Sequence, residues 1–109
     1  MTINEYQELA LRTINSEKTK AEQLVNGVMG LCGESGECCD IVKKHMFQGH
    51  ELNREKLLAE LGDVAWYLAL AAYALDTQLE EVLAGNIDKL RKRYPQGFSA
   101  EKSVNREAD

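Results

Sequence analysis

The chain has 109 residues and a formal net charge of −5, with 44% hydrophobic and 28% charged residues. This length and composition predict one globular domain with a modest core. The negative charge argues against non-specific binding to nucleic-acid polymers or to anionic membranes. The N-terminus is polar-rich, and the longest apolar run, 64–75, is too short to span a bilayer. We therefore expect a cytoplasmic protein with no membrane partner.

A single proline and the lack of alternating apolar and polar residues predict an all-α chain, a four-helix bundle. In chain order, the expected helices cover 3–14, 20–47, 54–75 and 79–94. Three starts carry Ser or Thr followed by Glu three residues later, which is the capping box: Thr2, Thr19 and Thr77. Asn53 is the N-cap candidate of the helix 54–75. The segment 100–109 has no pattern and is predicted to be a flexible tail behind a domain of residues 1–99.

The helix 20–47 contains a glycine at every third position from Gly27 to Gly36. Such a spiral allows another backbone or a ligand to approach closely, or it marks a break in the helix. We expect one continuous helix. Its three cysteines, Cys32, Cys38 and Cys39, lack the spacing of a zinc site and are expected to be small apolar packers.

Two pairs of acids, Glu34 with Glu37 and Glu60 with Asp63, lie inside apolar helix faces. A spacing of three residues places both members of a pair on one face. The loop at about 48–52 is short, so the two helices are expected to be antiparallel neighbours. Both pairs lie about 15 Å from this turn and therefore come level. Four carboxylates that face one another require a cation.

Four carboxylates without histidine favour a hard cation, Mg²⁺ with Mn²⁺ as a substitute. A di-iron site would need Glu-x-x-His, whereas Asp40 stands three residues after Glu37. Because Mg²⁺ commonly shares its ligand shell with phosphates, the site suits polyphosphate hydrolysis, with attack by a water that the metal activates or a carboxylate holds. One pair of acids alone would be typical of a solvated helix surface. Two pairs at the same height on neighbouring helices favour a metal site.

The helix 79–94 provides possible phosphate ligands. Asn86 falls in the middle of its apolar stripe, flanked by Lys89 and Arg93. Basic residues at a helix end also stabilise the helix dipole, but this does not explain an asparagine in the stripe. We interpret the three residues as a clamp for phosphate and sugar. Lys44, on the carboxylate face, is expected either to neutralise phosphate or to pair with an acid.

The sequence contains GESGE at 33–37, a lysine pair at 43–44, ELGDVAWYLA at 60–69 and NIDKLRKRYP at 86–95. With these motifs, from the first helix to about Ser99, it resembles the MazG-like nucleoside triphosphate pyrophosphohydrolases of the all-α NTP pyrophosphatase superfamily. The resemblance implies an enzyme that hydrolyses NTPs or dNTPs at the α-phosphate to the monophosphate and pyrophosphate. It also implies Mg²⁺, assembly as a dimer or tetramer, and a set of catalytic metal ligands: Glu34, Glu37, Glu60 and Asp63.

The run 64–75 is apolar on every side, which independently favours a homo-oligomer. Trp66 and Tyr73 are expected at its interface, whereas Tyr67, one turn after Asp63, is the candidate for contacting the nucleotide. Two alternatives stay open: a phosphoribosyl-ATP pyrophosphatase of the same superfamily, and a non-catalytic helical oligomer with a structural or sensing Ca²⁺ or Mg²⁺ site. The sequence leaves open the base and the sugar of the substrate.

Overall fold

A computed structural model describes residues 1–106, which form helices and no strand. This confirms the predicted all-α class with four longer helices. The elements are α1 (Ile3–Ala10), the 3₁₀ turn η1 (Leu11–Thr13), α2 (Lys20–Phe47), α3 (Arg54–Ala74), α4 (Leu79–Arg93) and α5 (Ala100–Val104). They belong to two compact units, one of Met1–Leu79 and one that begins at Glu80. A single domain over 1–99 stays a prediction.

The helix starts follow the capping signals. Thr19 and Glu22 form the reciprocal capping box of α2, and the Thr2 hydroxyl accepts a hydrogen bond from the Glu5 N–H. The Asn53 side chain accepts from the N–H of Lys56 at the start of α3. These bonds satisfy backbone donors that a helix leaves open in its first turn. The predicted helix 3–14 is divided, since α1 ends at Ala10 and continues as η1.

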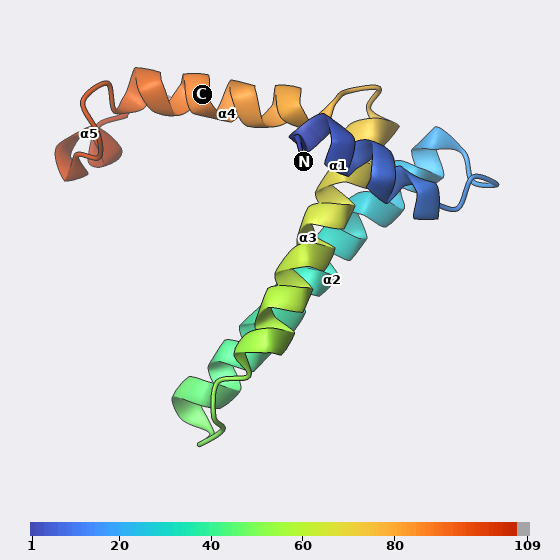
Figure 1. Cartoon of the computed structure of the whole chain (residues 1–109). Coiled ribbons are helices and arrows are strands. Elements are labelled where there is room, and N and C mark those ends of the chain that lie inside the picture. The colour runs from blue at the N-terminus through green and yellow to red at the C-terminus, as the bar shows by residue number, and fades with distance from the viewer. Residues whose placement is uncertain (107–109) are drawn as a thin grey trace. The chain divides into compact units, whose positions relative to one another are not determined.

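The core of the first unit is the antiparallel pair α2 and α3, which lie side by side (Figure 1). The glycines of α2 differ in how closely α3 approaches them. A Cβ at Gly27 would lie 3.0 Å from the backbone nitrogen of Ala71, and one at Gly30 would lie within 2.5 Å of the Tyr67 ring. Gly33 has nothing within 4 Å of the same position. The first two glycines therefore allow close helix packing, and α2 is continuous as expected.

A buried glutamine holds α1 on the C-terminal half of α3. The Gln7 Nε2 donates to the carbonyl of Ala69 at 3.1 Å and to that of Thr77 at 3.4 Å. Its Oε1 accepts from the N–H of Leu79 at 2.9 Å. One side chain of α1 thus connects α3 with the first residue of α4, and this explains why a polar group is tolerated in the core.

Trp66 and Tyr73, which are expected at an interface between copies, also contact groups of their own chain. The Trp66 Nε1 donates to the Ala10 carbonyl at 3.1 Å and to the Thr13 hydroxyl at 2.8 Å. The ammonium of Lys20 lies 3.6 Å from the centroid of the Tyr73 ring. Both side chains are half-buried, and their place at an interface between copies stays a prediction.

The second unit contains α5, a helix of five residues where a flexible tail was expected. The Ser99 hydroxyl accepts from the N–H of Lys102 and caps it. The helix is too short for a periodic apolar pattern, so periodicity could not predict it. Residues 107–109 of the predicted tail lie outside the described residues.

By length and composition, one helix among residues 1–106 could cross a membrane. It is α3, with 21 residues and a mean hydropathy of 1.3. The core helix of a globular protein meets the same criterion, and α3 packs along α2 over much of its length. The prediction of a run too short for a bilayer considered only 64–75, whereas the helix begins ten residues earlier, at Arg54.

Candidate metal centre

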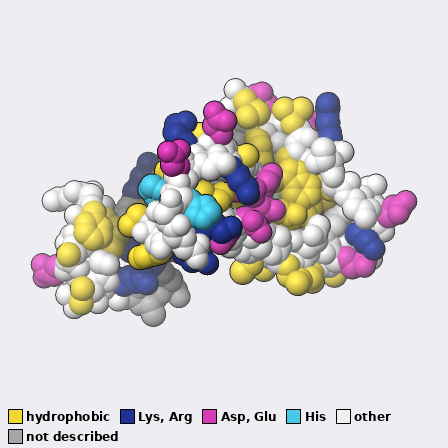
Figure 2. Space-filling view, turned by 90° about the horizontal axis from the view of Figure 1, so that it is seen from below, with side chains coloured by type: hydrophobic (Ala, Val, Ile, Leu, Met, Phe, Trp, Pro, Cys, Tyr) yellow, Lys and Arg dark blue, Asp and Glu magenta, His cyan; other side chains and the backbone are white. Residues whose placement is uncertain are grey.

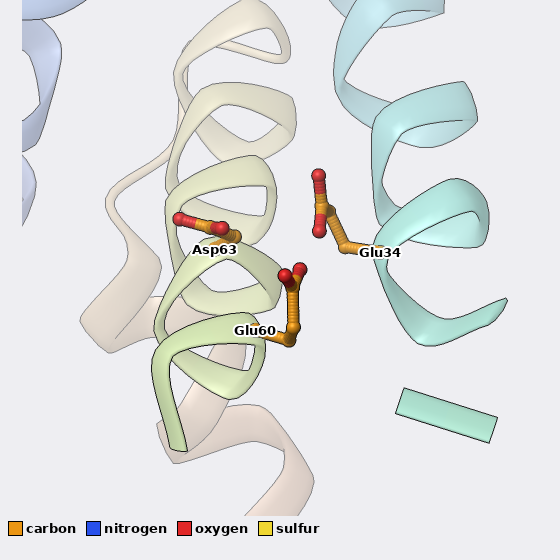
Figure 3. A group of neighbouring side chains, drawn as sticks. All are labelled: Glu34, Glu60 and Asp63. Atoms are coloured by element: carbon orange, nitrogen blue, oxygen red, sulfur yellow. The ribbon is translucent and has the colours of Figure 1, made fainter. Parts of the chain in front are cut away.

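Three carboxylates converge between α2 and α3. Glu34 comes from α2, and Glu60 and Asp63 come from successive turns of α3 (Figure 3). One oxygen of each lies within 4.8 Å of the others. Glu34 and Glu60 are half-buried, and Asp63 is exposed. The level position that the turn and the helix rise predicted is therefore confirmed for these three acids.

The electrostatics of the cluster suit a cation. A hydrogen bond with Glu60, burial, and the charges of Glu60, Asp63 and Glu37 raise the pKa of Glu34 from 4.5 to about 7. The shift means that neighbouring negative charge opposes ionisation of Glu34. Three oxygen donors with excess negative charge fit a hard divalent ion, which would relieve this repulsion.

Glu37, the fourth predicted ligand, is not part of the group within 4.8 Å. Its exposed side chain lines a neighbouring cleft of about 190 Å³ near the α2–α3 turn, together with Asp40 and Lys44. Because Glu60 and Asp63 have the same spacing and both join the cluster, the rotamer of Glu37 rather than its helix position turns it into this cleft. In the structure, three of the four predicted carboxylates come together.

Lys44 takes the second of its two predicted roles, that of pairing with an acid. Its ammonium lies 2.8 Å from Oδ2 of Asp40, one turn earlier on α2. A hydrogen bond from Lys44 lowers the pKa of Asp40, and the same bond raises the pKa of Lys44. Lys44 therefore places a positive charge on the same helix as Glu34 and Glu37, but this charge is already paired with Asp40.

Both histidines, His45 and His50, are exposed. The His45 Nδ1 donates to the carbonyl of His50 at 2.9 Å, which closes the C-terminal end of α2. Seen from this end of the molecule, they lie among Lys, Arg, Asp and Glu side chains, while apolar side chains also reach the surface (Figure 2). Neither histidine belongs to the carboxylate group.

Tyr67, the predicted nucleotide contact, lies against Gly30 on the inner side of the helix pair. Its ring forms an edge-to-face pair with Trp66, with centroids 5.0 Å apart. Trp66 in turn is held by α1 and η1. The ring one turn after Asp63 is thus fixed by packing, as a side chain that orients a ligand should be.

The sequence interpretation missed two residues near the cluster. Burial and the charge of Asp63 raise the pKa of Tyr6 on α1. Burial and the charges of Glu60, Cys39 and Glu34 raise the pKa of the half-buried Cys38. Cys38 could have been found, because it follows Glu34 by one helical turn. Tyr6 could not, because its position depends on how α1 crosses α3.

The predicted clamp of Asn86, Lys89 and Arg93 lies on α4 in the second unit. Their spacing of three and four residues puts the three side chains on one face of that helix. Arg93 is half-buried, and the other two residues are exposed. Their contact with a substrate stays a prediction.

Comparison with known proteins finds similarity over most of this sequence. The family model of the MazG nucleotide pyrophosphohydrolase domain matches residues 1–98. The Gene 37 protein of Mycobacterium phage L5 is 44% identical over 73 residues, which are 63% of this chain and 64% of that protein. The match thus spans less than two thirds of the relative, and no solved structure gives a significant match. Because the family model covers nearly the whole sequence, the chain belongs to the MazG nucleotide pyrophosphohydrolase family.

Proposed function

We propose that this chain hydrolyses nucleoside triphosphates, NTP or dNTP, to the nucleoside monophosphate and pyrophosphate with Mg²⁺, for which Mn²⁺ can substitute. The observation that carries the proposal is the convergence of Glu34, Glu60 and Asp63 from two helices. Membership in the MazG family supports the same class of reaction. The proposal includes a cytoplasmic location and no nucleic-acid polymer or membrane as a partner.

In this proposal, Glu34, Glu60 and Asp63 hold the cation between α2 and α3, and Glu37 joins them by a change of side-chain rotamer. When bound, Mg²⁺ would neutralise phosphate charge and activate water. The carboxylates orient a water for in-line attack on the α-phosphate and accept its proton.

The proposal assigns roles toward the substrate to further residues of each unit. In the first unit, Tyr67 presents a fixed ring on the face of Asp63, and Lys44 places a positive charge on the face of Glu37. In the second unit, Asn86 is assigned to the sugar. Lys89 and Arg93 are assigned to the leaving pyrophosphate, whose charge guanidinium and ammonium groups bind well.

The metal assignment is tested with Glu60→Gln, which keeps the shape of the side chain. Its matched control is Glu55→Gln, an exposed acid in the first turn of the same helix. Glu60→Gln should lower kcat/KM at least about 100-fold, because several kcal/mol of charge stabilisation are lost. It should also abolish the rise in Tm that Mg²⁺ causes, while the control keeps both. If Glu60→Gln retains activity within a few-fold, Glu60 is not a metal ligand.

The bond that is cut is tested by phosphorus NMR of a triphosphate reaction. We expect a monophosphate and pyrophosphate, no free orthophosphate, and little activity on nucleoside diphosphates. Lys89→Ala should cost about 2–4 kcal/mol of transition-state stabilisation. Orthophosphate released together with a diphosphate would show that a different bond is cut, and the proposed cleavage at the α-phosphate would be wrong. If Mg²⁺ binds but no nucleotide in a panel of NTPs and dNTPs is hydrolysed, the chain is a metal-binding helical protein instead.

A further inference from the structure

The chain leaves α3 through a turn that has an unexpected residue at its centre. The N–H of Thr77 donates to the carbonyl of Ala72 at 2.9 Å. The N–H of Asp76 donates to the carbonyl of Tyr73, also at 2.9 Å. This is the Schellman arrangement, which ends a helix with one left-handed residue, most often glycine. Here that residue is Asp76, with a φ of 55°. Because glycine adopts this conformation at lower cost, the aspartate is better explained by what its side chain contacts.

The carboxylate of Asp76 pairs with Lys20, the first residue of α2. The Lys20 ammonium lies 3.0 Å from Oδ1 of Asp76 and donates to the carbonyl of Tyr73 at 3.0 Å. It also lies 3.6 Å from the centroid of the Tyr73 ring. The side chains of Lys20 and Asp76 are 45% and 84% exposed, so the ion pair alone adds little stability. Together, the three contacts tie the end of α3 to the start of α2.

A second side chain holds the chain where it enters α4. The Oε1 of Gln7 accepts from the N–H of Leu79, and its Nε2 donates to the carbonyl of Thr77. Gln7 and Leu79 are each 6% exposed. Because the first N–H groups of a helix have no partner within it, Gln7 of α1 acts as a cap that another helix contributes to α4. The junction 75–79 is therefore held at its start by Lys20 and at its end by Gln7.

The helix that begins at this junction carries the predicted clamp of Asn86, Lys89 and Arg93. We propose that Gln7, Lys20 and Asp76 are positioning residues for substrate binding. By holding the junction, they limit the motion of the start of α4 and so raise the effective concentration of the clamp at the metal centre. A group on a restrained tether meets its target more often than the same group on a loose tether. This inference rests on the proposed function, since it concerns how the same substrate is bound.

Two exposed substitutions, Lys20→Met and Asp76→Gly, release the junction and leave the clamp and the carboxylates unchanged. The matched control is Lys18→Met, which removes the same charge from an exposed lysine that makes none of these contacts. The KM for a triphosphate should rise roughly tenfold in both variants and stay unchanged in the control. The clamp engages the triphosphate before the bond is cut, so the lost restraint affects the ground state and the transition state alike. For this reason, kcat should stay within about twofold of the wild type.

Asp76→Gly separates positioning from stability. Glycine favours the φ of this residue, and the exposed ion pair adds little, so Tm should not fall. A residue with a purely structural role would change Tm without raising KM, whereas a positioning residue raises KM at the wild-type Tm. Hydrogen exchange of the Leu79 amide gives a readout that does not depend on activity, and it should become at least about tenfold faster in both variants.

Gln7→Met tests the buried side of the junction. It should raise KM as well, but it leaves buried backbone groups of Ala69, Thr77 and Leu79 without a partner. It should therefore also lower Tm, and the decision is made with the two exposed variants.

The outcomes distinguish this inference from the proposed function. If the wild type hydrolyses triphosphates and the KM of Lys20→Met and Asp76→Gly equals that of Lys18→Met, the positioning role is wrong and the proposed function stands. The same conclusion follows if the Leu79 amide exchanges at the wild-type rate in both variants. A wild-type chain that binds Mg²⁺ and hydrolyses no triphosphate overturns the proposed function, and the positioning role with it.

Discussion

The close packing of α2 on α3 can be tested by adding one methyl group at two places in the same helix. In Gly30→Ala, the new Cβ lies within 2.5 Å of three atoms of the Tyr67 ring. In Gly33→Ala, it meets nothing within 4 Å. Both changes gain about 1 kcal/mol of helix propensity. The difference between the two variants therefore isolates the packing at Gly30.

The overlap at Gly30 must be relieved by moving the Tyr67 ring or by separating the helices. Forcing an extra methyl group into a packed site costs about 1–3 kcal/mol. If the ring moves, its edge-to-face pair with Trp66 is also weakened. Such an aromatic pair contributes about 0.5–1.5 kcal/mol to stability. Gly33→Ala should therefore be more stable than the wild type, and Gly30→Ala should be less stable than Gly33→Ala by about 1–3 kcal/mol.

Thermal unfolding at one fixed protein concentration measures this difference, since association would shift Tm with concentration. For a domain of this size, the two variants should melt roughly 5–15 °C apart. Gly30→Ala should also lose affinity for the nucleotide, because the displaced ring is the predicted substrate contact. If the two variants melt within about 2 °C of each other, the tight contact between Gly30 and Tyr67 is wrong.

Two further predictions concern Glu34 and Trp66. Folding raises the pKa of Glu34 from 4.5 to about 7. Between these pH values, the folded state therefore binds more protons than the unfolded state. The metal-free protein should accordingly lose stability as the pH rises from 4.5 to about 7. Glu34→Gln should remove this part of the pH dependence of Tm, and an unchanged slope would contradict the shift. Trp66→Phe removes the donor that reaches Ala10 and Thr13 and should destabilise the fold by about 1–2 kcal/mol in urea titrations. Stability equal to the wild type would mean that these bonds do not hold α1.

Local patterns in the sequence were sufficient for α2, α3 and α4 and for the matching heights of Glu34 and Glu60, but not for the division of the first helix or for α5. Capping residues and the 3.6-residue period act within one or two turns, so they predict where α2 and α3 begin and how far Glu34 and Glu60 lie from the turn. The short loop then makes these acids neighbours. The residue motifs also identified the family before any geometry was known.

The tertiary structure alone decided which side chains complete the site. Glu34 and Glu37 have the same chemistry and the same helix face, yet only Glu34 joins the cluster, because rotamers respond to the packing around them. Likewise, Trp66 turns to α1, and Tyr6 comes within reach of the charge of Asp63, through a crossing of helices that no local pattern encodes. Helix periodicity is a property of neighbouring residues, whereas contacts between helices depend on the shapes of both surfaces.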